Sequence, residues 1–409
     1  MACTLPVELM LEIVARSNLS TLVHCAATNK DLRREILSPP FIRRVSQQGG
    51  VVPPRIHAYL RTDVDLEASL PPLSLASPAT PAAAAFFEDH LSPFVTRNAA
   101  DLLAGYRPVT SRGGLVLLRR RNIYRRMKSM NCSNLCVYDL ITGHRTFFVD
   151  PPKISIWWHA CVLLAAPDNI GCFFRLLVAK VDNRYADNGC SIRVQIATPS
   201  EVGGASWGPV MKYFHIGLPS EGLQYNRDAN VVHGGVIHFP MLTYNNEMIL
   251  TYNVHTEKVG TVKLPHINSK ASQRHLGTSP DGMLRLLIAD GFKISVWLQL
   301  IGGDWTLETV IDTEKKLRSL DPDIPPGHAM IEFMDEPGEK SGPVLLRIRH
   351  PDMWLHDDEL PIMDVGDGGP LINFDLGTKE MHRRSPVSSL AVLLEIDMVS
   401  HLQSMRIFS

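Results

Sequence analysis

VYDLITG (residues 137–143), TYNVHTE (251–257) and NFDLGTK (373–379) are three versions of one phrase, and this phrase decides the fold. In each version an apolar, β-prone stretch precedes Asp or Asn, and Thr follows three residues later. An Asp or Asn at the start of a turn accepts hydrogen bonds from backbone N–H groups two or three residues further on. The phrase therefore predicts a strand that ends in a tight turn, at three separate places.

A second kind of turn alternates with the first along the chain. VGGASW (202–207) and IGGDW (301–305) each carry two glycines shortly before a Trp. Glycine supplies the positive φ that tight hairpins require. The five turns lie near residues 139, 205, 253, 304 and 375, which gives intervals of roughly 50 to 70 residues.

Short apolar runs recur upstream of these turns, and they are too short for long helices. They are GGLVLL (113–118), CFFRLLVAK (172–180), GGVIHF (234–239), DGMLRLLIAD (281–290) and GPVLLRIRH (342–350). Repeated antiparallel sheets of this kind bury their faces by stacking in a ring. We expect a propeller-like antiparallel β domain of five to seven blades, and a large irregular β-sandwich is the alternative. The last run, SSLAVLLEID (388–397), could complete the first sheet and close the ring.

The N-terminal segment from Leu5 to Val45 differs from the rest and predicts three short helices. Leu5, Leu9 and Ile13 recur every four residues and form one apolar stripe. Pro6 suits a first helical turn, because its missing N–H would be unpaired there. Ser20 predicts the N-cap of a second helix, and a third helix ends at Pro39 and Pro40. Fold class is therefore mainly β with a small α-helical N-terminal domain.

This segment resembles an F-box, the docking motif of substrate receptors in cullin-type ubiquitin ligases. The matching residues are Leu5-Pro6, Glu8-Leu9, Glu12-Ile13, Leu22-Val23, Lys30, Arg33, Ser38-Pro39 and Phe41. Asn29 and Asp31-Leu32 stand where many F-boxes carry Cys and an Arg-Trp pair. Taken whole, the chain is similar to the large F-box families of plants, especially grasses, in phrases such as ILTYNVHTEKVGTVKLP (249–265).

The resemblance implies the substrate-receptor subunit of an SCF-type ubiquitin ligase, which performs no chemistry itself and has no cofactor. Its partners would be a Skp-type adaptor, a cullin scaffold reached through that adaptor, and an unknown target protein. The expected adaptor-binding residues are Leu5, Pro6, Leu9, Ile13, Leu22 and Phe41. The alternative is a non-ligase β scaffold for protein interactions, whose N-terminal helices merely cap it.

Three units follow from these patterns: a helical F-box domain at 1–46, a Pro/Ala/Ser-rich linker at 47–90 and a recognition domain at 91–409. Within the recognition domain, Trp157 and Trp158 are adjacent. Because neighbours on a strand point to opposite faces, one of this pair is a candidate for the target-binding surface.

Composition narrows the function classes. Net charge is -1 and the pI is about 7.0, which gives no reason to expect a nucleic-acid partner. Charge is nevertheless uneven, with 13 Lys/Arg against 6 Asp/Glu in residues 41–130 and 6 against 16 in residues 301–370. RRRNIYRRMK (119–128) could be an import signal or a phosphate-binding patch, and an exposed loop is the favoured interpretation. With no apolar run long enough for a membrane span and no signal peptide, we expect the cytosol or nucleus and reduced cysteines.

No catalytic motif emerges from the sequence. A G-x-S-x-G elbow and a phosphate-binding G-x-x-x-x-G-K-[ST] loop are both absent. Cys132 and Cys136 with His144 and His159 could suggest zinc, but their spacing differs from that of a zinc knuckle. We therefore expect neither enzyme activity nor a metal site.

Overall fold

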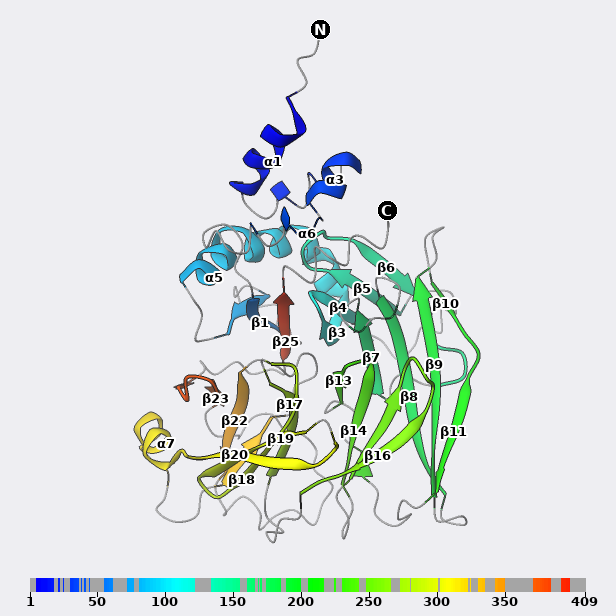
Figure 1. The fold of residues 1–409 in the computed structure, drawn as a ribbon, viewed down its shortest axis with the longest axis vertical. Coiled ribbons are helices and arrows are strands. Elements are labelled where there is room, and N and C mark those ends of the chain that lie inside the picture. The colour runs from blue at the N-terminus through cyan, green and yellow to red at the C-terminus, as the bar shows by residue number, and fades with distance from the viewer. Residues whose placement is uncertain are drawn as a thin grey trace.

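The fold is a ring of antiparallel sheets that carries a group of helices at one end (Figure 1). The computed structural model describes residues 5–17, 21–22, 25, 30–36, 38, 40–41, 44, 55–61, 72–76, 81–121, 134–154, 160–165, 168, 170, 174–184, 189–199, 205–216, 224–225, 230–242, 248–265, 273–279, 281–300, 302–322, 324, 330–334, 343–349, 371–383 and 391–397. Six sheets are present in these residues, and they form a six-bladed β-propeller arrangement.

Five blades follow one another along the chain, and in each the strand order follows the sequence. Blade 1 contains β3 (Tyr106–Arg112), β4 (Leu115–Arg120), β5 (Leu135–Asp139) and β6 (Arg145–Phe148). Blade 2 contains β7 (Ala160–Ala165), β8 (Phe174–Arg184), β9 (Gly189–Pro199) and β10 (Ala205–Trp207), with β11 (Met211–Ile216) also paired to β9. Blade 3 contains β13 (Val231–His233), β14 (Val236–Leu242), β15 (Met248–Asn253) and β16 (Val259–Lys263), with β12 (Gln224–Tyr225) also paired to β14.

The next two blades repeat the pattern. Blade 4 contains β17 (Gln273–Thr278), β18 (Leu284–Asp290), β19 (Lys293–Gln299) and β20 (Trp305–Asp312), and helix α7 (Glu314–Leu320) follows it. Blade 5 contains β21 (Met330–Phe333), β22 (Val344–Arg349), β23 (Leu371–Phe374) and β24 (Met381–Arg383). The five apolar runs of the sequence form the second strands, β4, β8, β14, β18 and β22, and the five predicted turns each join a third strand to a fourth.

Blade 6 joins the two ends of the ring. Its strand order is β2 (Leu73–Leu75), β1 (Arg55–Arg61) and β25 (Ala391–Asp397), and β1 pairs with β25 along its whole length. The strand at Ala391–Asp397 thus closes the ring as predicted, but it does so in a separate sheet with β1 and does not complete the sheet of blade 1. The prediction of a linker is wrong at residues 55–61, because these form a strand whose central residues are buried.

The predicted Asx turns are confirmed. Asp139 Oδ1 accepts hydrogen bonds from Ile141 N and Thr142 N, at 2.9 and 3.2 Å. Asn253 Oδ1 accepts from the N–H groups two and three residues on, each at 2.9 Å. Asp375 Oδ1 accepts from Thr378 N at 2.9 Å. One local rule therefore ends the third strand of blades 1, 3 and 5.

A long helical stretch crosses the end of the ring. It consists of α5 (Pro81–Phe86), a π-helical turn η1 (Phe87–Leu91) and α6 (Ser92–Gly105). The prediction of a linker is wrong here too, because Phe87, Leu91 and Val95 are buried in the main core. Alanine is the strongest helix former, and PAAAAF (81–86) continues as helix instead of forming an extended spacer.

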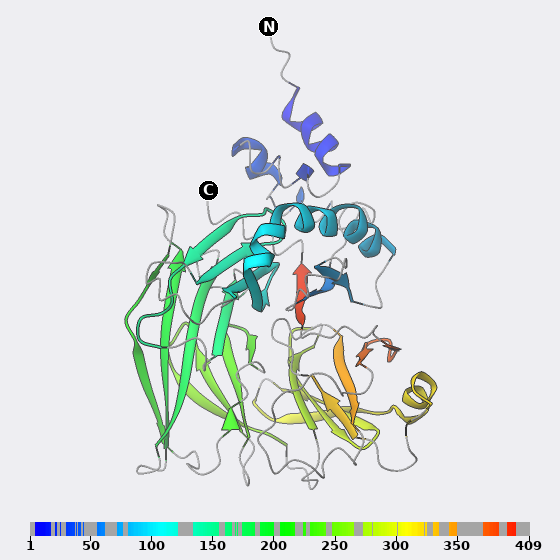
Figure 2. The same cartoon turned by 180° about the vertical axis from the view of Figure 1, so that it is seen from behind.

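Helices α1 (Val7–Ala15) and α3 (Lys30–Ile36) lie on the far side of α5 and α6 from the sheets (Figures 1 and 2). Thr21, Leu22 and Cys25 are helical, but most of the predicted second helix falls outside the described residues. The three-helix F-box therefore stays a prediction. Within the described ranges, none of the helices combines the length and the apolarity that crossing a bilayer needs.

Candidate functional site

Helix α1 is the first candidate site, because it presents apolar side chains to solvent. The helix starts after Pro6, whose carbonyl accepts a hydrogen bond from Met10 N at 3.1 Å. Glu8 lies in the first turn, where a carboxylate suits the positive end of the helix dipole. At the other end, Ser17 Oγ donates to Val14 O at 2.8 Å. The helix is thus well defined at both ends.

The two faces of this segment have opposite environments. Leu5, Leu9 and Ile13 are 52%, 52% and 57% exposed, although all three are large and apolar. Val14 and Ala15, one and two residues beyond Ile13, are only 4% and 0% exposed. Since residues four apart lie on the same helix face, Leu9 and Ile13 form an exposed apolar stripe on α1, and Leu5 precedes the helix at the same spacing. We call Leu5, Leu9 and Ile13 the α1 stripe.

The buried face of the segment shares a core with the body of the protein. Its members Val14, Leu22, Ile36 and Phe41 belong to one hydrophobic cluster that includes residues of α5, α6, β1, β4 and β25. The helices are therefore fixed to the propeller by packing. Burial of apolar surface at roughly 25 cal/mol per Å² makes such packing the main stabilising term.

An ion-pair network supports the helix beside the stripe. The Glu12 carboxylate accepts from Arg16 one turn later, with Nη2 and Oε1 2.7 Å apart, and from the Arg44 guanidinium. Hydrogen bonds from Arg44 and Arg16 hold the pKa of Glu12 below its usual value. Arg44 thereby connects the end of the helical segment back to the middle of α1.

The six residues predicted to bind an adaptor divide into two groups. Leu5, Leu9 and Ile13 are exposed, and Pro6 lies exposed beside them. Leu22 and Phe41 are 0% and 7% exposed, so they are core residues and present no surface to a partner. The other predicted pair, Trp157 and Trp158, lies outside the described residues.

Two surface residues were missed by the sequence prediction. Val7 is 37% exposed and extends the apolar surface of α1. Its position in the first turn, where no preceding turn can cover it, is the signal that could have identified it. Arg44 lies 32 residues from Glu12, and no spacing rule predicts that contact.

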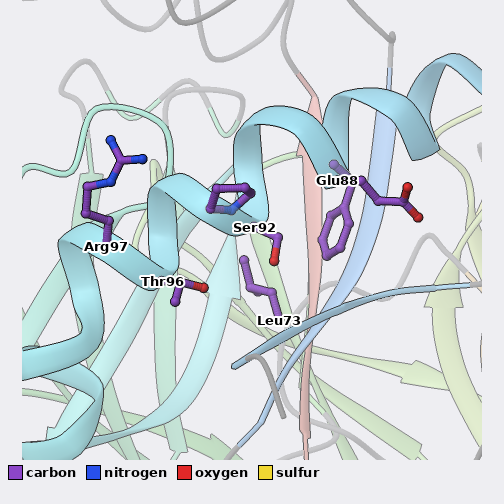
Figure 3. Close-up of a pocket in the computed structure, with 7 residues that line it drawn as sticks. Leu73, Glu88, Ser92, Thr96 and Arg97 are labelled. Atoms are coloured by element: carbon purple, nitrogen blue, oxygen red, sulfur yellow. The ribbon is translucent and has the colours of Figure 1, made fainter. Parts of the chain in front are cut away.

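A second candidate is an open hollow of about 620 Å³ beside the long helix and β2. Its apolar lining residues are Leu73 of β2 and Phe87 and Pro93 of the helix, and Glu88 and Arg97 carry opposite charges at its two ends (Figure 3). These two charged residues are nine positions apart, which is about 13 Å along a helix. They cannot converge on one atom, and the geometry therefore suits binding better than proton transfer.

A third candidate is a small cavity between the first strands of blades 1 to 4. Its lining includes Ser111, Val162 and Val232, and its volume of about 20 Å³ is close to the space that one water molecule needs. Ser111 Oγ donates to Leu393 O at 2.5 Å, which ties the innermost strands of blades 1 and 6 together. A substrate does not fit at this position.

An ion pair beside this cavity joins three blades. Arg112 at the end of β3 donates to Asp168 from Nη2 at 2.7 Å and from Nε at 3.3 Å, and Asp168 is 2% exposed. The backbone carbonyl of Asp168 is 3.1 Å from Nε2 of His255 in blade 3. Two-pronged contact between an Arg and a buried carboxylate is a strong, geometrically specific interaction. We interpret this cluster as a structural clasp, because all of its groups bond to one another.

Metal-binding chemistry has no site in the part of the chain that the structure describes, where no three His, Cys, Asp or Glu side chains gather. Cys136, one member of the zinc set considered above, is buried in β5, and burial raises the pKa of its thiol to about 12. A thiol with such a pKa is neither a ready metal ligand nor a nucleophile at neutral pH. Cys132 and His159 lie outside the described residues.

Solved structures similar to this chain include a β-propeller domain. A protein from Lactobacillus plantarum matches at 11% identity over 81% of this chain and 82% of its own, with a TM-score of 0.35. The periplasmic gluconolactonase PpgL of Pseudomonas aeruginosa matches at 13% identity over 81% and 83%, with a TM-score of 0.33. The β-propeller domain of Cps50 (Swd1) from Myceliophteria thermophila matches at 10% identity over 70% and 88%, with a TM-score of 0.32. Scores this low support no conclusion about activity.

The sequence comparisons give one firm assignment. No curated protein matches the chain. A family model matches residues 76–353, which is more than half of the 409 residues and runs from the end of β2 to beyond β22. The chain therefore belongs to the family described as a domain of unknown function, DUF7595.

Proposed function

We propose that this protein is the substrate-receptor subunit of a cullin-type SCF ubiquitin ligase. In this proposal the α1 stripe docks to a Skp-type adaptor, and the propeller holds a target protein. The receptor performs no chemistry and needs no cofactor. Cytosol or nucleus as its location also stays a prediction.

One observation carries the proposal. Leu9 and Ile13 are more than half exposed on one face of α1, and Leu5, two residues before the helix, is also more than half exposed, whereas Val14 and Ala15 of the helix are buried. A soluble protein gains nothing from three aligned, exposed aliphatic side chains, and such patches are typical of partner-binding surfaces. The F-box resemblance of the same residues indicates which partner to test.

The rest of the molecule suits this role as a rigid connector. Since the helical segment shares its core with blade 6 and with α6, a partner bound to α1 would be held in a fixed position relative to the propeller. A ligase receptor works by proximity, because tethering raises the effective concentration of the target near the transferring enzyme. A flexible linker would weaken this effect, and residues 55–61 and 81–105 instead form packed elements.

The test uses the full-length chain, because the shared core makes an isolated N-terminal fragment a poor probe. Purified protein is titrated against a recombinant Skp-type adaptor by biolayer interferometry. We expect Leu9→Asp and Ile13→Asp each to weaken binding by about tenfold or more, since hot-spot contacts carry at least this much energy. Both residues are exposed, so the melting temperature should not change.

Val149→Asp is the matched control. Val149 is 51% exposed, like the residues of the stripe, but follows β6 on the outer rim of blade 1. It should leave adaptor affinity unchanged. If the wild-type protein does not bind the adaptor, or if Ile13→Asp binds as well as wild type, the docking proposal is wrong.

The shared core also favours a second candidate, a β scaffold for protein interactions that uses its N-terminal helices as a cap. Leu22, Ile36 and Phe41 cover part of the body, as a cap would. This alternative predicts no adaptor binding and no recovery of a cullin from cell extract. It does not explain why the α1 stripe is exposed, and we therefore rank it second.

A further inference from the structure

We propose that the outer edge of β20 binds an extended, basic segment of another protein, which would add to blade 4 as a fifth strand. This inference does not depend on the ligase proposal, because β20 and the α1 stripe are separate surfaces. It rests on the length of the strand, the direction of its backbone groups, its exposed side chains and its charge.

β20 is unusually long for the last strand of a blade. It has 8 residues, whereas β6 has 4, β16 has 5, and β10 and β24 have 3 each. It pairs with β19 and is the last strand of its sheet in the part of the chain that the structure describes. Proteins keep exposed strand edges short because an open edge is a template for another strand.

The register shows which backbone groups face outward. Thr313 N donates to Phe292 O at 3.0 Å, and the pairing continues through Ile311↔Ile294 and Thr309↔Val296. In an antiparallel ladder, hydrogen-bonded pairs alternate with pairs whose N–H and C=O groups point away. The backbone groups of Val310 and Asp312 therefore point away from β19, toward the position of an added strand.

The side chains along this edge are apolar and exposed. Leu307 and Val310 are 45% and 50% exposed. The register shift between Val296 and Trp297 skips Glu308, so that Leu307 and Val310 lie on the same face of blade 4 although they are three residues apart. Trp305 lies partly buried further along this face, packed against the core between blades 3 and 4. Together they form an apolar strip alongside the open edge.

The charge of the edge selects the kind of partner. Residues 300–312 contain Asp304, Glu308 and Asp312, all exposed, and no Lys or Arg. Lys293 of β19 is the cross-strand neighbour of Asp312, and the buried Arg285 of β18 interacts electrostatically with Glu308. Both basic residues belong to inner strands, so the charged groups of the edge strand itself are all carboxylates. An added strand with lysines or arginines opposite these carboxylates and aliphatic residues beside Val310 would complement the edge.

The same charges argue against a second copy of this chain as the occupant. An antiparallel β20–β20 pair centred on Glu308 would place Glu308 opposite its own copy and Asp304 near Asp312 of the other strand. Like charges directly opposite one another destabilise a strand pair. The edge therefore favours a foreign basic segment over self-association.

The experiment uses the full-length protein and a fluorescent seven-residue peptide of alternating lysine and valine. We expect saturable binding by fluorescence anisotropy, and a loss of about tenfold or more for the same peptide with N-methyl groups at alternate residues, which cannot pair its backbone. A glutamate–valine peptide of the same length should not bind.

Two variants locate the site. Val310→Pro removes an outward-pointing N–H without breaking the ladder to β19, because proline is tolerated at the solvent side of an edge strand. Glu308→Lys reverses the charge. Both should weaken binding by about tenfold, with an unchanged melting temperature, whereas Val149→Lys on blade 1 should have no effect.

Three outcomes would overturn the proposal. The lysine–valine peptide does not bind, the N-methylated peptide binds as tightly as the unmodified one, or the peptide binds Val310→Pro and Glu308→Lys as tightly as it binds the wild-type protein. A concentration-dependent dimer in sedimentation analysis that Val310→Pro dissolves would show that a second copy occupies the edge. Neither variant should affect adaptor binding through α1, so failure of this proposal is distinguishable from failure of the ligase proposal.

Discussion

Trp207 and Trp305 make the same contact in different blades: each indole Nε1–H donates over 2.9 Å to a backbone carbonyl of the preceding blade. The acceptor is Val149 O beyond β6 for Trp207, and Lys263 O at the end of β16 for Trp305. Both tryptophans follow a Gly-Gly pair in a hairpin between third and fourth strands. The Gly-Gly…Trp phrase is therefore a device that ties neighbouring blades together at their rims.

We predict that Trp207→Phe and Trp305→Phe each destabilise the protein. The substitution keeps most of the apolar ring but removes the donor, and a lost hydrogen bond of this kind costs about 1 kcal/mol. Urea unfolding followed by circular dichroism measures the change. Thr306→Ser, an exposed substitution on the same strand, is the control, and equal stability of all variants would contradict the role of the contact.

The Asx turns give a prediction about backbone strain. The seventh and last residue of each phrase has positive φ: +72° at Gly143, +56° at Glu257 and +59° at Lys379. Gly143→Ala should cost about 1–2 kcal/mol, because a left-handed conformation is unfavourable for a residue with a Cβ. The new Cβ would also lie 3.3 Å from Cζ of Phe94.

Lys379→Gly is the reciprocal experiment, since it relieves the same strain at the equivalent turn position. Its effect should be small, because the relief is offset by the greater flexibility of glycine in the unfolded chain. Thermal unfolding of both variants tests the argument. If Gly143→Ala is as stable as wild type, the turn does not require this conformation.

Protonation of the buried His238 should lower the free energy of unfolding in mild acid. Burial lowers its pKa from 6.5 to about 4, and its Nδ1 lies 3.3 Å from Val231 O. Since the folded pKa is below the unfolded one, stability is complete above pH 6.5 and falls as the pH drops toward 4. Over this window the group accounts for about 3 kcal/mol at most.

His238→Asn tests this assignment, because the amide can still donate to Val231 O but does not titrate. The stability of the variant should depend less on pH between 4 and 6.5 than that of wild type, as measured by urea unfolding at several pH values. The pKa of His233 is also lowered, by burial and by Arg112, and His233 is present in both proteins. Identical pH profiles would rule out His238 as the source.

A Leu→Ala substitution should have different effects on the buried and the exposed face of the N-terminal segment. Leu22→Ala should destabilise the protein by about 2–4 kcal/mol, because Leu22 is 0% exposed and its truncation leaves a cavity. Leu9→Ala should leave stability within about 0.5 kcal/mol of wild type, because its side chain is already in solvent. Calorimetry separates the two, and only Leu9→Ala should weaken adaptor binding at full structural integrity.

Local signals explain why much of the propeller could be predicted from the sequence. The Asx phrases at Asp139, Asn253 and Asp375 specify turns through contacts within five residues, and all three turns are present. The exposed stripe of α1 was likewise visible as a four-residue period. The burial of Leu22 and Phe41 was not predictable from the sequence. Which side chains the body covers depends on packing between segments that are distant along the chain.

The sheet that closes the ring shows the limit of such reasoning. RIHAYLR (55–61) lies between proline-rich stretches, so its composition favours a linker. Its partner strand is more than 300 residues away, with Arg55 opposite Asp397, and no short-range pattern records that pairing. The blade number was left open for the same reason, since blade 6 combines strands from both ends of the described chain.

This closure has a consequence for how the protein is made. A ribosome adds roughly 5–20 residues per second, so β1 leaves the ribosome roughly 15 to 70 seconds before β25 has been synthesised. During this delay β1 lacks its main partner strand. The nascent chain therefore has an unpaired strand edge, to which chaperones or neighbouring chains can bind. Premature termination within the last twenty residues before Asp397 should therefore send nearly the whole translation product to degradation, a penalty far greater than the length lost.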